Sequence, residues 1–171
     1  VLIQEVEYLR SFLFGRMGWS AVNALLIVSG AFGVLHRETV VQAGGYRTDT
    51  MGEDMELILR IHRMLIREQR RYRVSYIPDP ICWTEVPDTF RGLQAQRVRW
   101  HRGLSESLWL NRELCFQRGS GKVGWFAFPF FALFEWFSPV VEILGYLYCA
   151  YLLMYGRIDA TAALTFLAFA V

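Results

Sequence analysis

Two short motifs hold the residues whose types and spacing could do chemistry. Gly52-Glu53-Asp54 puts two carboxylates where a helix is expected to begin, and Gln96-Arg97-Val98-Arg99-Trp100 combines an amide, two guanidiniums and an indole. A carboxylate can act as a general base, and an arginine can grip a phosphate through two parallel hydrogen bonds. An indole offers a flat apolar surface for a sugar ring. Together these are the groups that sugar transfer from a nucleotide donor needs.

Helical spacing brings the groups of the second motif together. On a helix, Gln96, Arg99 and Trp100 stand at positions i, i+3 and i+4, one above another on a single face. Such a face could hold a diphosphate through Arg99, fix its geometry with Gln96, and offer Trp100 as a stacking platform.

Each motif also has a simpler interpretation. Acids in the first turn of a helix complement its dipole, and arginines or a tryptophan beside an apolar segment are common at membrane surfaces. Neither interpretation explains both motifs occurring in this order before an apolar region.

The elements that must position these motifs follow from hydrophobic periodicity and turn residues. Helices are expected over residues 2–14, 37–43, 54–67 and from Thr89 to about Cys115. Gly15 and Gly18 are expected to break the first helical pattern. Strands are expected over 34–36, 73–77 and 81–84, with a strand or a helix end over 24–28. This mixture predicts an α/β fold.

The helix that carries the two acids is expected to begin with a capping box. Thr50 would be the N-cap, and Glu53, three residues later, would be its reciprocal partner. Asp54 would then lie in the first turn.

A long apolar region follows Trp125. No basic side chain occurs from there to Tyr155, whereas a membrane-spanning helix needs roughly 20 apolar residues. Pro129 and Pro139 are therefore expected to kink or divide it. The arginines before it would place that side in the cytoplasm. A second apolar run begins after Asp159, and the predicted division is 1–123 for a catalytic part and 124–171 for a transmembrane region.

Glu135 and Glu142 stand seven residues apart in this region, which predicts one helical face. Acidic groups there should face protein or water rather than lipid. They would either line a polymer path or pair with an arginine of a neighbouring helix.

Composition narrows the partners. The chain of 171 residues carries a net charge of only +2, and 54% of it is hydrophobic. A nucleic-acid-binding domain would be far more basic. The three cysteines and three histidines lack metal-ligand spacing, so no zinc site or disulfide framework is expected. Since the chain lacks an initial Met and ends in an apolar run, we expect a piece of a longer protein.

Four segments, in this order and before the apolar helices, resemble the family 2 glycosyltransferases: Ser29-Gly30-Ala31-Phe32-Gly33, Gly44-Gly45-Tyr46, Gly52-Glu53-Asp54 and Gln96-Arg97-Val98-Arg99-Trp100. Within that family the chain looks most like the membrane-embedded synthases of cellulose, hyaluronan and poly-N-acetylglucosamine. The likeness covers roughly residues 1–155.

The resemblance implies a GT-A catalytic domain on the cytoplasmic face of a multi-pass inner-membrane protein. It also implies a UDP-sugar donor, Mg²⁺ or Mn²⁺, and inversion at the anomeric carbon. By motif match, Asp54 would be the general base of the pair Glu53-Asp54. Gln96, Arg97 and Arg99 would hold the donor diphosphate, and Trp100 would bind the acceptor.

The chain departs from the family pattern in two places. Gly52 stands where the family often has Thr or Ser. The family's aspartate motifs for uridine and metal are absent from this sequence. The chain therefore resembles the acceptor-side half of the domain, with metal ligands expected upstream and no activity expected without the donor-binding half.

The leading hypothesis is a membrane transferase that makes a β-linked polysaccharide on a glycan or lipid-linked acceptor, with the bilayer and an export subunit as partners. A non-processive transferase to a lipid carrier is the first alternative. The second is a non-catalytic scaffold or transport subunit. An upstream Asp-x-Asp after a strand would favour an enzyme. Among smaller candidates, Trp83 is expected to pack in the core and His62 to serve structure.

Overall fold

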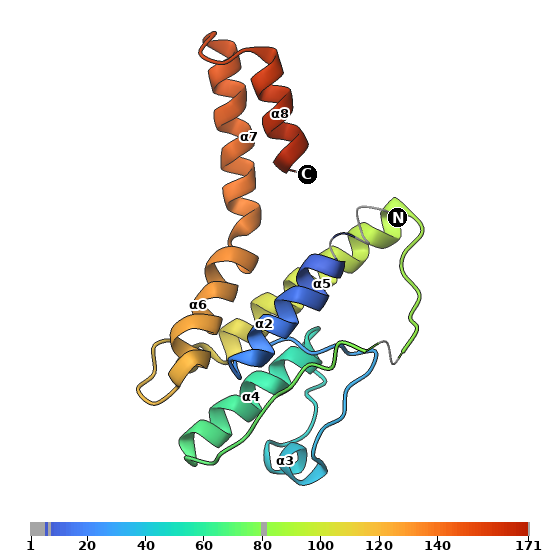
Figure 1. Cartoon of the computed structure of the whole chain (residues 1–171), viewed down its shortest axis with the longest axis vertical. Coiled ribbons are helices and arrows are strands. Elements are labelled where there is room, and N and C mark those ends of the chain that lie inside the picture. The colour runs from blue at the N-terminus through green and yellow to red at the C-terminus, as the bar shows by residue number, and fades with distance from the viewer. Residues whose placement is uncertain (1–5, 7, 80–81, 171) are drawn as a thin grey trace. The chain divides into compact units, whose positions relative to one another are not determined.

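The computed structural model of the protein describes residue 6, residues 8–79 and residues 82–170 (Figure 1). By their contacts, the residues form two compact units, Val1–Phe131 and Ala132–Val171. The predicted boundary after residue 123 separates a catalytic part from a transmembrane region. It is a functional boundary, which the contacts do not test, and it stays a prediction.

The first unit is built from helices and connecting loops. They are the π-helix η1 (Tyr8–Gly15), α2 (Arg16–Ala21), α3 (Arg37–Gln42), α4 (Glu53–Arg67), α5 (Phe90–Leu110), the 3₁₀ turn η2 (Arg112–Leu114), the π-helix η3 (Val123–Ala127) and α6 (Phe128–Phe130). A further π-helix, η4 (Phe131–Trp136), spans the boundary between the units.

The helices expected over 37–43 and 54–67 and after Thr89 are confirmed. Thr89 is the N-cap of α5, and its hydroxyl accepts the Gly92 N–H at 3.1 Å. Gly44 and Gly45 end α3 with φ angles of 90° and 74°, a conformation that glycine adopts without strain. Local sequence signals therefore placed these helices correctly.

The expected break at Gly15 and Gly18 is wrong. Within the described residues, helical structure runs on from η1 through α2 to Ala21. Trp19 in α2 packs against Phe130 and Phe131, with ring centroids 5.1 and 5.9 Å away. This packing stabilises a helix that the glycines alone would weaken. The predicted start over residues 2–5 lies outside the described residues.

None of the expected strands forms in the described residues, and Ile81 lies outside them. The segment around Tyr72 is fastened by side chains instead. The Asn23 amide donates to the Tyr72 carbonyl at 3.0 Å and accepts the Val74 N–H at 3.0 Å. The Ser20 hydroxyl accepts the Tyr76 N–H at 2.8 Å. A β-strand needs backbone hydrogen bonds to a neighbouring strand, and here side chains take those backbone groups. The described residues therefore form helices and extended segments, and the expected α/β alternation is not observed in them.

Helix α4 carries the core of this unit. Leu57, Ile61 and Leu65 are buried on one face, and Leu35, Val40 and Tyr72 pack against them. His62 on α4 is fully buried. Its Nε2 lies 3.0 Å from the Leu25 carbonyl oxygen and its Nδ1 lies 2.6 Å from the Tyr72 hydroxyl. His62 therefore connects α4 to two extended segments, which agrees with the structural role predicted for it.

Burial lowers the pKa of His62 from 6.5 to about 4, which makes stability depend on pH. As the pH falls, the unfolded chain takes up a proton first, so the folded state is disfavoured. We expect this contribution to be complete above about pH 6.5 and to be lost towards pH 4, by up to about 3 kcal/mol.

Urea unfolding of the complete protein at pH 7.5 and pH 5 measures this dependence. His62→Gln should reduce the difference between the two pH values, and His36→Gln, at an exposed histidine, should preserve it. An unchanged difference in His62→Gln would assign the dependence to other groups.

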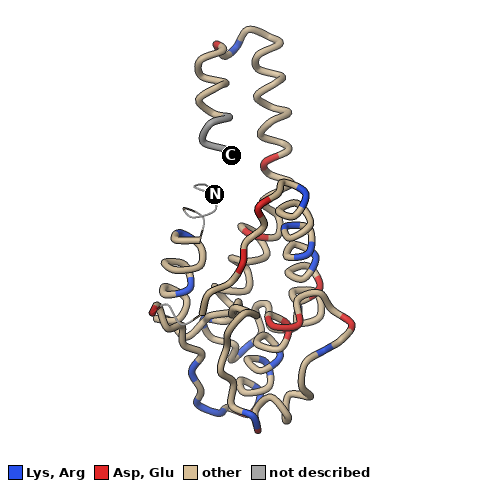
Figure 2. Tube along the Cα trace, turned by 90° about the vertical axis from the view of Figure 1, so that its right-hand side faces the viewer, with Lys and Arg blue, Asp and Glu red and all other residues tan. Residues whose placement is uncertain are grey.

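The second unit is a helical hairpin of α7 (Ser138–Met154) and α8 (Ala160–Ala170). Gly156, with φ 62°, helps to turn the chain, and the Asp159 carboxylate accepts the Ala162 N–H at 2.7 Å. In Figure 2 the hairpin is tan along most of its length, because few of its residues are charged. Arg157 and Asp159 lie in the turn between the two helices, and the second apolar run expected after Asp159 forms α8.

Among the described residues, no single helix is long and apolar enough to cross a membrane. The helical stretches Val123–Trp136 and Ser138–Met154, bent at the break between them, pass the length and composition criteria only as a pair. The expected division near Pro139 is confirmed, because the break falls at Phe137, whereas Pro129 lies inside the helical stretch.

The break also corrects the interpretation of the two glutamates. Glu135 lies in η4 and Glu142 lies in α7, so their spacing of seven does not place them on one continuous helical face. The Glu142 carboxylate accepts a hydrogen bond from the Ser138 hydroxyl at 3.0 Å.

Candidate active site

The start of α4, which carries the first motif, contacts α5 at Gly103, three residues beyond the end of the second motif. A Cβ added to Gly52 would lie 2.7 Å from the Gly103 carbonyl oxygen, and one added to Gly103 would lie 2.9 Å from the Gly52 Cα. Only glycine at both positions allows this backbone contact. Asp54 follows the crossing by two residues on α4, and Trp100 precedes it by about one turn on α5.

Hydrogen bonds hold the crossing in place. One oxygen of Glu106 accepts from the Thr50 hydroxyl at 2.9 Å and from the Met51 N–H at 2.8 Å. The other accepts from Arg102 Nε at 2.7 Å. These hydrogen bonds hold the pKa of Glu106 below its usual value, and the bond from Arg102 has the largest effect. The Ser107 hydroxyl, also on α5, donates to the Gly52 carbonyl at 3.2 Å.

The expected capping box is wrong. The N-cap of α4 is Gly52, without a side-chain cap. The Thr50 hydroxyl accepts the Gly52 N–H at 3.2 Å but donates to Glu106 on α5. The tertiary contact between the two helices therefore takes the place of the local cap.

Asp54 is half-buried at the start of α4, in the first turn, as the sequence predicts. Its Oδ1 accepts the Met55 N–H at 2.7 Å. Its Oδ2 would lie 3.2 Å from a Cβ on Gly30, so the glycine of the 29–33 loop leaves room for the carboxylate. Burial raises the pKa of Asp54, Glu53 adds to the rise, and Arg16 opposes it. A raised pKa suits a general base, because it strengthens the affinity for a proton.

The Trp100 ring makes a cation–π contact and an aromatic contact. The Arg97 guanidinium lies over it at 5.1 Å, and the Phe12 ring meets it edge-on at 5.7 Å. The contact with Phe12 joins η1 to α5. The indole is 36% exposed, which leaves part of its surface open to a ligand.

The arginines of the second motif differ in environment. Arg97 is partly buried and stacks on Trp100, whereas Arg99 is exposed and Gln96 is partly buried. The contact of Arg97 with the indole was not expected, because the predicted face comprised Gln96, Arg99 and Trp100.

Sequence reasoning missed the aromatic and basic residues of η1 and α2. Phe12 contacts both Tyr8, at 4.5 Å between ring centroids, and Trp100. The Arg16 guanidinium lies 4.4 Å from the centre of the Phe12 ring. The spacing of Phe12 and Arg16, i and i+4 on a helix, was an available signal, but the expected break at Gly15 concealed it.

The expectation for Trp83 changes, and Arg102 has a structural role. Trp83 is 98% exposed, so its expected place in the core is wrong. Arg102 pairs with Glu106 through a 2.7 Å contact and contributes to the helix crossing.

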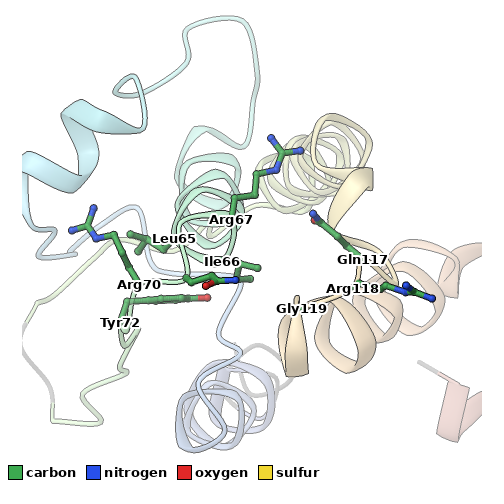
Figure 3. A pocket seen from close by; sticks show the side chains of 9 residues that line it. Leu65, Ile66, Arg67, Arg70, Tyr72, Gln117, Arg118 and Gly119 are labelled. Atoms are coloured by element: carbon green, nitrogen blue, oxygen red, sulfur yellow. The ribbon is translucent and has the colours of Figure 1, made fainter.

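A separate cavity of about 620 Å³ lies between the end of α4 and the loop 117–119. Arg67 on its rim pairs with Glu113, and Arg70 bonds to Gln42 and Glu68. The guanidiniums of its arginines point away from its centre (Figure 3). None of the predicted site residues lines this cavity.

The divalent metal implied by the family resemblance stays a prediction. Within the described parts of the chain, no group of three or more His, Cys, Asp or Glu side chains could hold a metal ion. The expectation that the metal ligands lie upstream of this chain also stays a prediction.

Comparison with known proteins defines the class. The sequence profile described as "Glycosyl transferase family group 2" matches residues 6–170, and the chain belongs to this family. It is 34% identical over 106 residues to the poly-beta-1,6-N-acetyl-D-glucosamine synthase of Staphylococcus aureus strain COL, and 31% identical over 106 residues to that of Staphylococcus epidermidis. Each match covers 62% of this chain and 24% of the relative, so the chain spans about a quarter of those synthases. No solved structure matches the chain significantly.

Proposed function

We propose that this chain is part of a membrane-bound inverting glycosyltransferase that builds a β-linked glycan from a UDP-sugar, with Asp54 as the general base. The observation that carries the proposal is the backbone contact of Gly52 with Gly103. It joins the acid-bearing start of α4 to the helix that bears Trp100. Membership of the family supports the reaction class.

The residues suit a single displacement. The Asp54 carboxylate takes the proton of the acceptor hydroxyl while that oxygen forms a bond to the anomeric carbon. The bond from this carbon to the diphosphate oxygen breaks, and UDP leaves with the electron pair. Because the enzyme forms no covalent intermediate, one displacement inverts the anomeric centre and converts an α-linked donor into a β-linked product.

Other groups bind and orient the substrates in this proposal. Trp100 stacks on the acceptor sugar and brings its hydroxyl towards the base, which converts binding into proximity. Arg99, exposed on α5, and Gln96 hold the donor diphosphate, whose charge grows as it leaves. Arg97 contributes through its contact with the indole, and Glu53 flanks the base.

The relatives suggest the first donor to test. Two similar proteins are named as synthases of a β-1,6-linked N-acetylglucosamine polymer, so we propose UDP-N-acetylglucosamine before other UDP-sugars. The broken apolar stretch after Val123 and the α7–α8 hairpin support a place in the bilayer with the catalytic part on the cytoplasmic face. An export subunit remains a further proposed partner.

Membranes that contain the complete protein, incubated with single UDP-sugars and Mg²⁺ or Mn²⁺, test the function directly. We expect incorporation from one donor into a product of high mass, measured by chromatographic sizing. A single sugar on a lipid would favour the non-processive alternative. No incorporation from any donor would favour a non-catalytic subunit.

A further inference from the structure

Three consecutive residues fasten the start of α4 to α5. The Thr50 hydroxyl and the Met51 N–H both donate to one carboxylate oxygen of Glu106, at 2.9 and 2.8 Å. The Gly52 carbonyl oxygen accepts the hydroxyl of the buried Ser107 at 3.2 Å. These three residues immediately precede the acidic pair of α4, so the position of that pair depends on the contacts with α5.

The start of α4 lacks the local device that usually fixes the first turn of a helix. Gly52 is the N-cap and makes no side-chain cap. A first turn without a cap has backbone N–H groups to satisfy and frays readily. Asp54 lies in this turn, whereas the core contacts of α4 are made further along, by Leu57, Ile61 and Leu65. Glu106 therefore holds, from a second helix, a helix start that has no side-chain cap of its own.

Helix α5 also carries the groups proposed to bind the substrates. Arg99 and Trp100 stand four and three residues before Gly103, whose backbone contacts that of Gly52. Residues at these spacings are neighbours on one helical face, and they lie within about 6 Å of each other along the helix axis. Glu106 follows Gly103 by three residues. The separation between the proposed base and the substrate-binding groups is therefore set beside Glu106.

The charge of Glu106 is paired on α5 itself. Its second oxygen accepts Arg102 Nε at 2.7 Å, one turn away. The Arg102 side chain is 63% exposed and that of Glu106 is 26% exposed, and surface pairs at this spacing contribute little to stability. The oxygen that binds Thr50 and Met51 is therefore the important part of the Glu106 side chain, and an uncharged amide oxygen could replace it.

We propose that Glu106 is a positioning residue of the transfer reaction, which fixes the first turn of α4, and with it Asp54, against the part of α5 that carries Arg99 and Trp100. This inference rests on the proposed function. Glu106 acts through residues 50–52 and takes no part in bond making.

The kinetics of sugar transfer by the complete protein test this role. A misplacement of about 1 Å can reduce a rate about 100-fold, so Glu106→Ala should lower kcat about 10- to 100-fold. The KM for the donor should change less than about 2-fold, because the variant leaves the donor-binding groups in place. Glu106→Gln retains an oxygen for Thr50 and Met51 and should keep kcat within about 3-fold of the wild type. Wild-type kcat in Glu106→Ala, or a Gln variant as slow as the Ala variant, would overturn the proposal.

Glu113→Ala is the matched control. Glu113 also connects α4 to the chain beyond α5, because it pairs with Arg67 at 2.6 Å. Arg67 is the last residue of α4, at the opposite end of the helix from Asp54. Glu113→Ala should therefore keep the wild-type kcat. An equal loss of kcat in Glu113→Ala and Glu106→Ala would refute the positioning role, because the effect would then come from the general attachment of α4.

A milder pair of variants keeps the test informative if Glu106→Ala does not accumulate in membranes. Thr50→Val removes the hydroxyl that donates to Glu106 and should lower kcat about 2- to 10-fold, the equivalent of one hydrogen bond. Thr50→Ser keeps a hydroxyl and should stay close to the wild type. An unchanged kcat in Thr50→Val would contradict the proposal.

The wild-type protein and Asp54→Asn separate the two proposals. If the wild-type protein transfers no sugar, the proposed function itself fails. If it transfers sugar, Asp54→Asn does not, and the Glu106 and Thr50 variants behave like the wild type, only this inference fails.

Discussion

Replacement of Asp54 by Asn in the complete protein is expected to lower sugar transfer at least about 100-fold, because general-base catalysis supplies about 10²–10⁴-fold. The amide cannot take the proton of the acceptor hydroxyl. Its oxygen can still accept the Met55 N–H that Asp54 binds at 2.7 Å, so the helix start should persist. Initial rates with the active donor measure the loss, and equilibrium binding of the donor should be nearly unchanged.

Asp49→Asn is the control for this change. Asp49 is exposed and pairs with Arg47 at 2.6 Å, outside the helix crossing. Transfer by this variant should remain close to that of the wild type. Turnover at the wild-type rate in Asp54→Asn would remove Asp54 from the mechanism.

Gly103→Ala is expected to cause a large loss of stability. The new Cβ would lie 2.9 Å from both the Cα and the N of Gly52, and backbone atoms cannot turn aside as a flexible side chain can. Overpacking of this kind costs about 1–3 kcal/mol of unfolding free energy. Because Asp54 follows the crossing by two residues, the separation of the helices should also reduce transfer. Denaturant unfolding of the purified complete protein measures the first effect.

Gly18→Ala provides the matched comparison. No atom lies within 4 Å of its added Cβ in α2, and alanine favours a helix over glycine by up to about 1 kcal/mol. This variant should therefore be as stable as the wild type or more stable. Equal stability of Gly103→Ala and wild type would show that the two helices have room to part.

Much of the candidate site could be predicted because its signals are local. The residues of both motifs, and the helices that bear them, follow from residue type and apolar spacing. Membership of the family, expected from four short motifs, is confirmed by the match over residues 6–170. The strands were not predictable in the same way, because a β-ladder needs a second backbone. Here the side chains of Ser20 and Asn23 accept backbone N–H groups that a neighbouring strand would otherwise bind.

The sequence by itself determined α4, α5 and the glycine stop after α3, since helical hydrogen bonds and caps join residues that are near in the chain. Only the tertiary structure decided that the Thr50 hydroxyl donates a hydrogen bond to Glu106 on α5 and that the backbones of Gly52 and Gly103 are in contact. It also brought Phe12 to Trp100. These contacts join residues distant in sequence, and they depend on how closely helices approach, which periodicity along one helix does not encode.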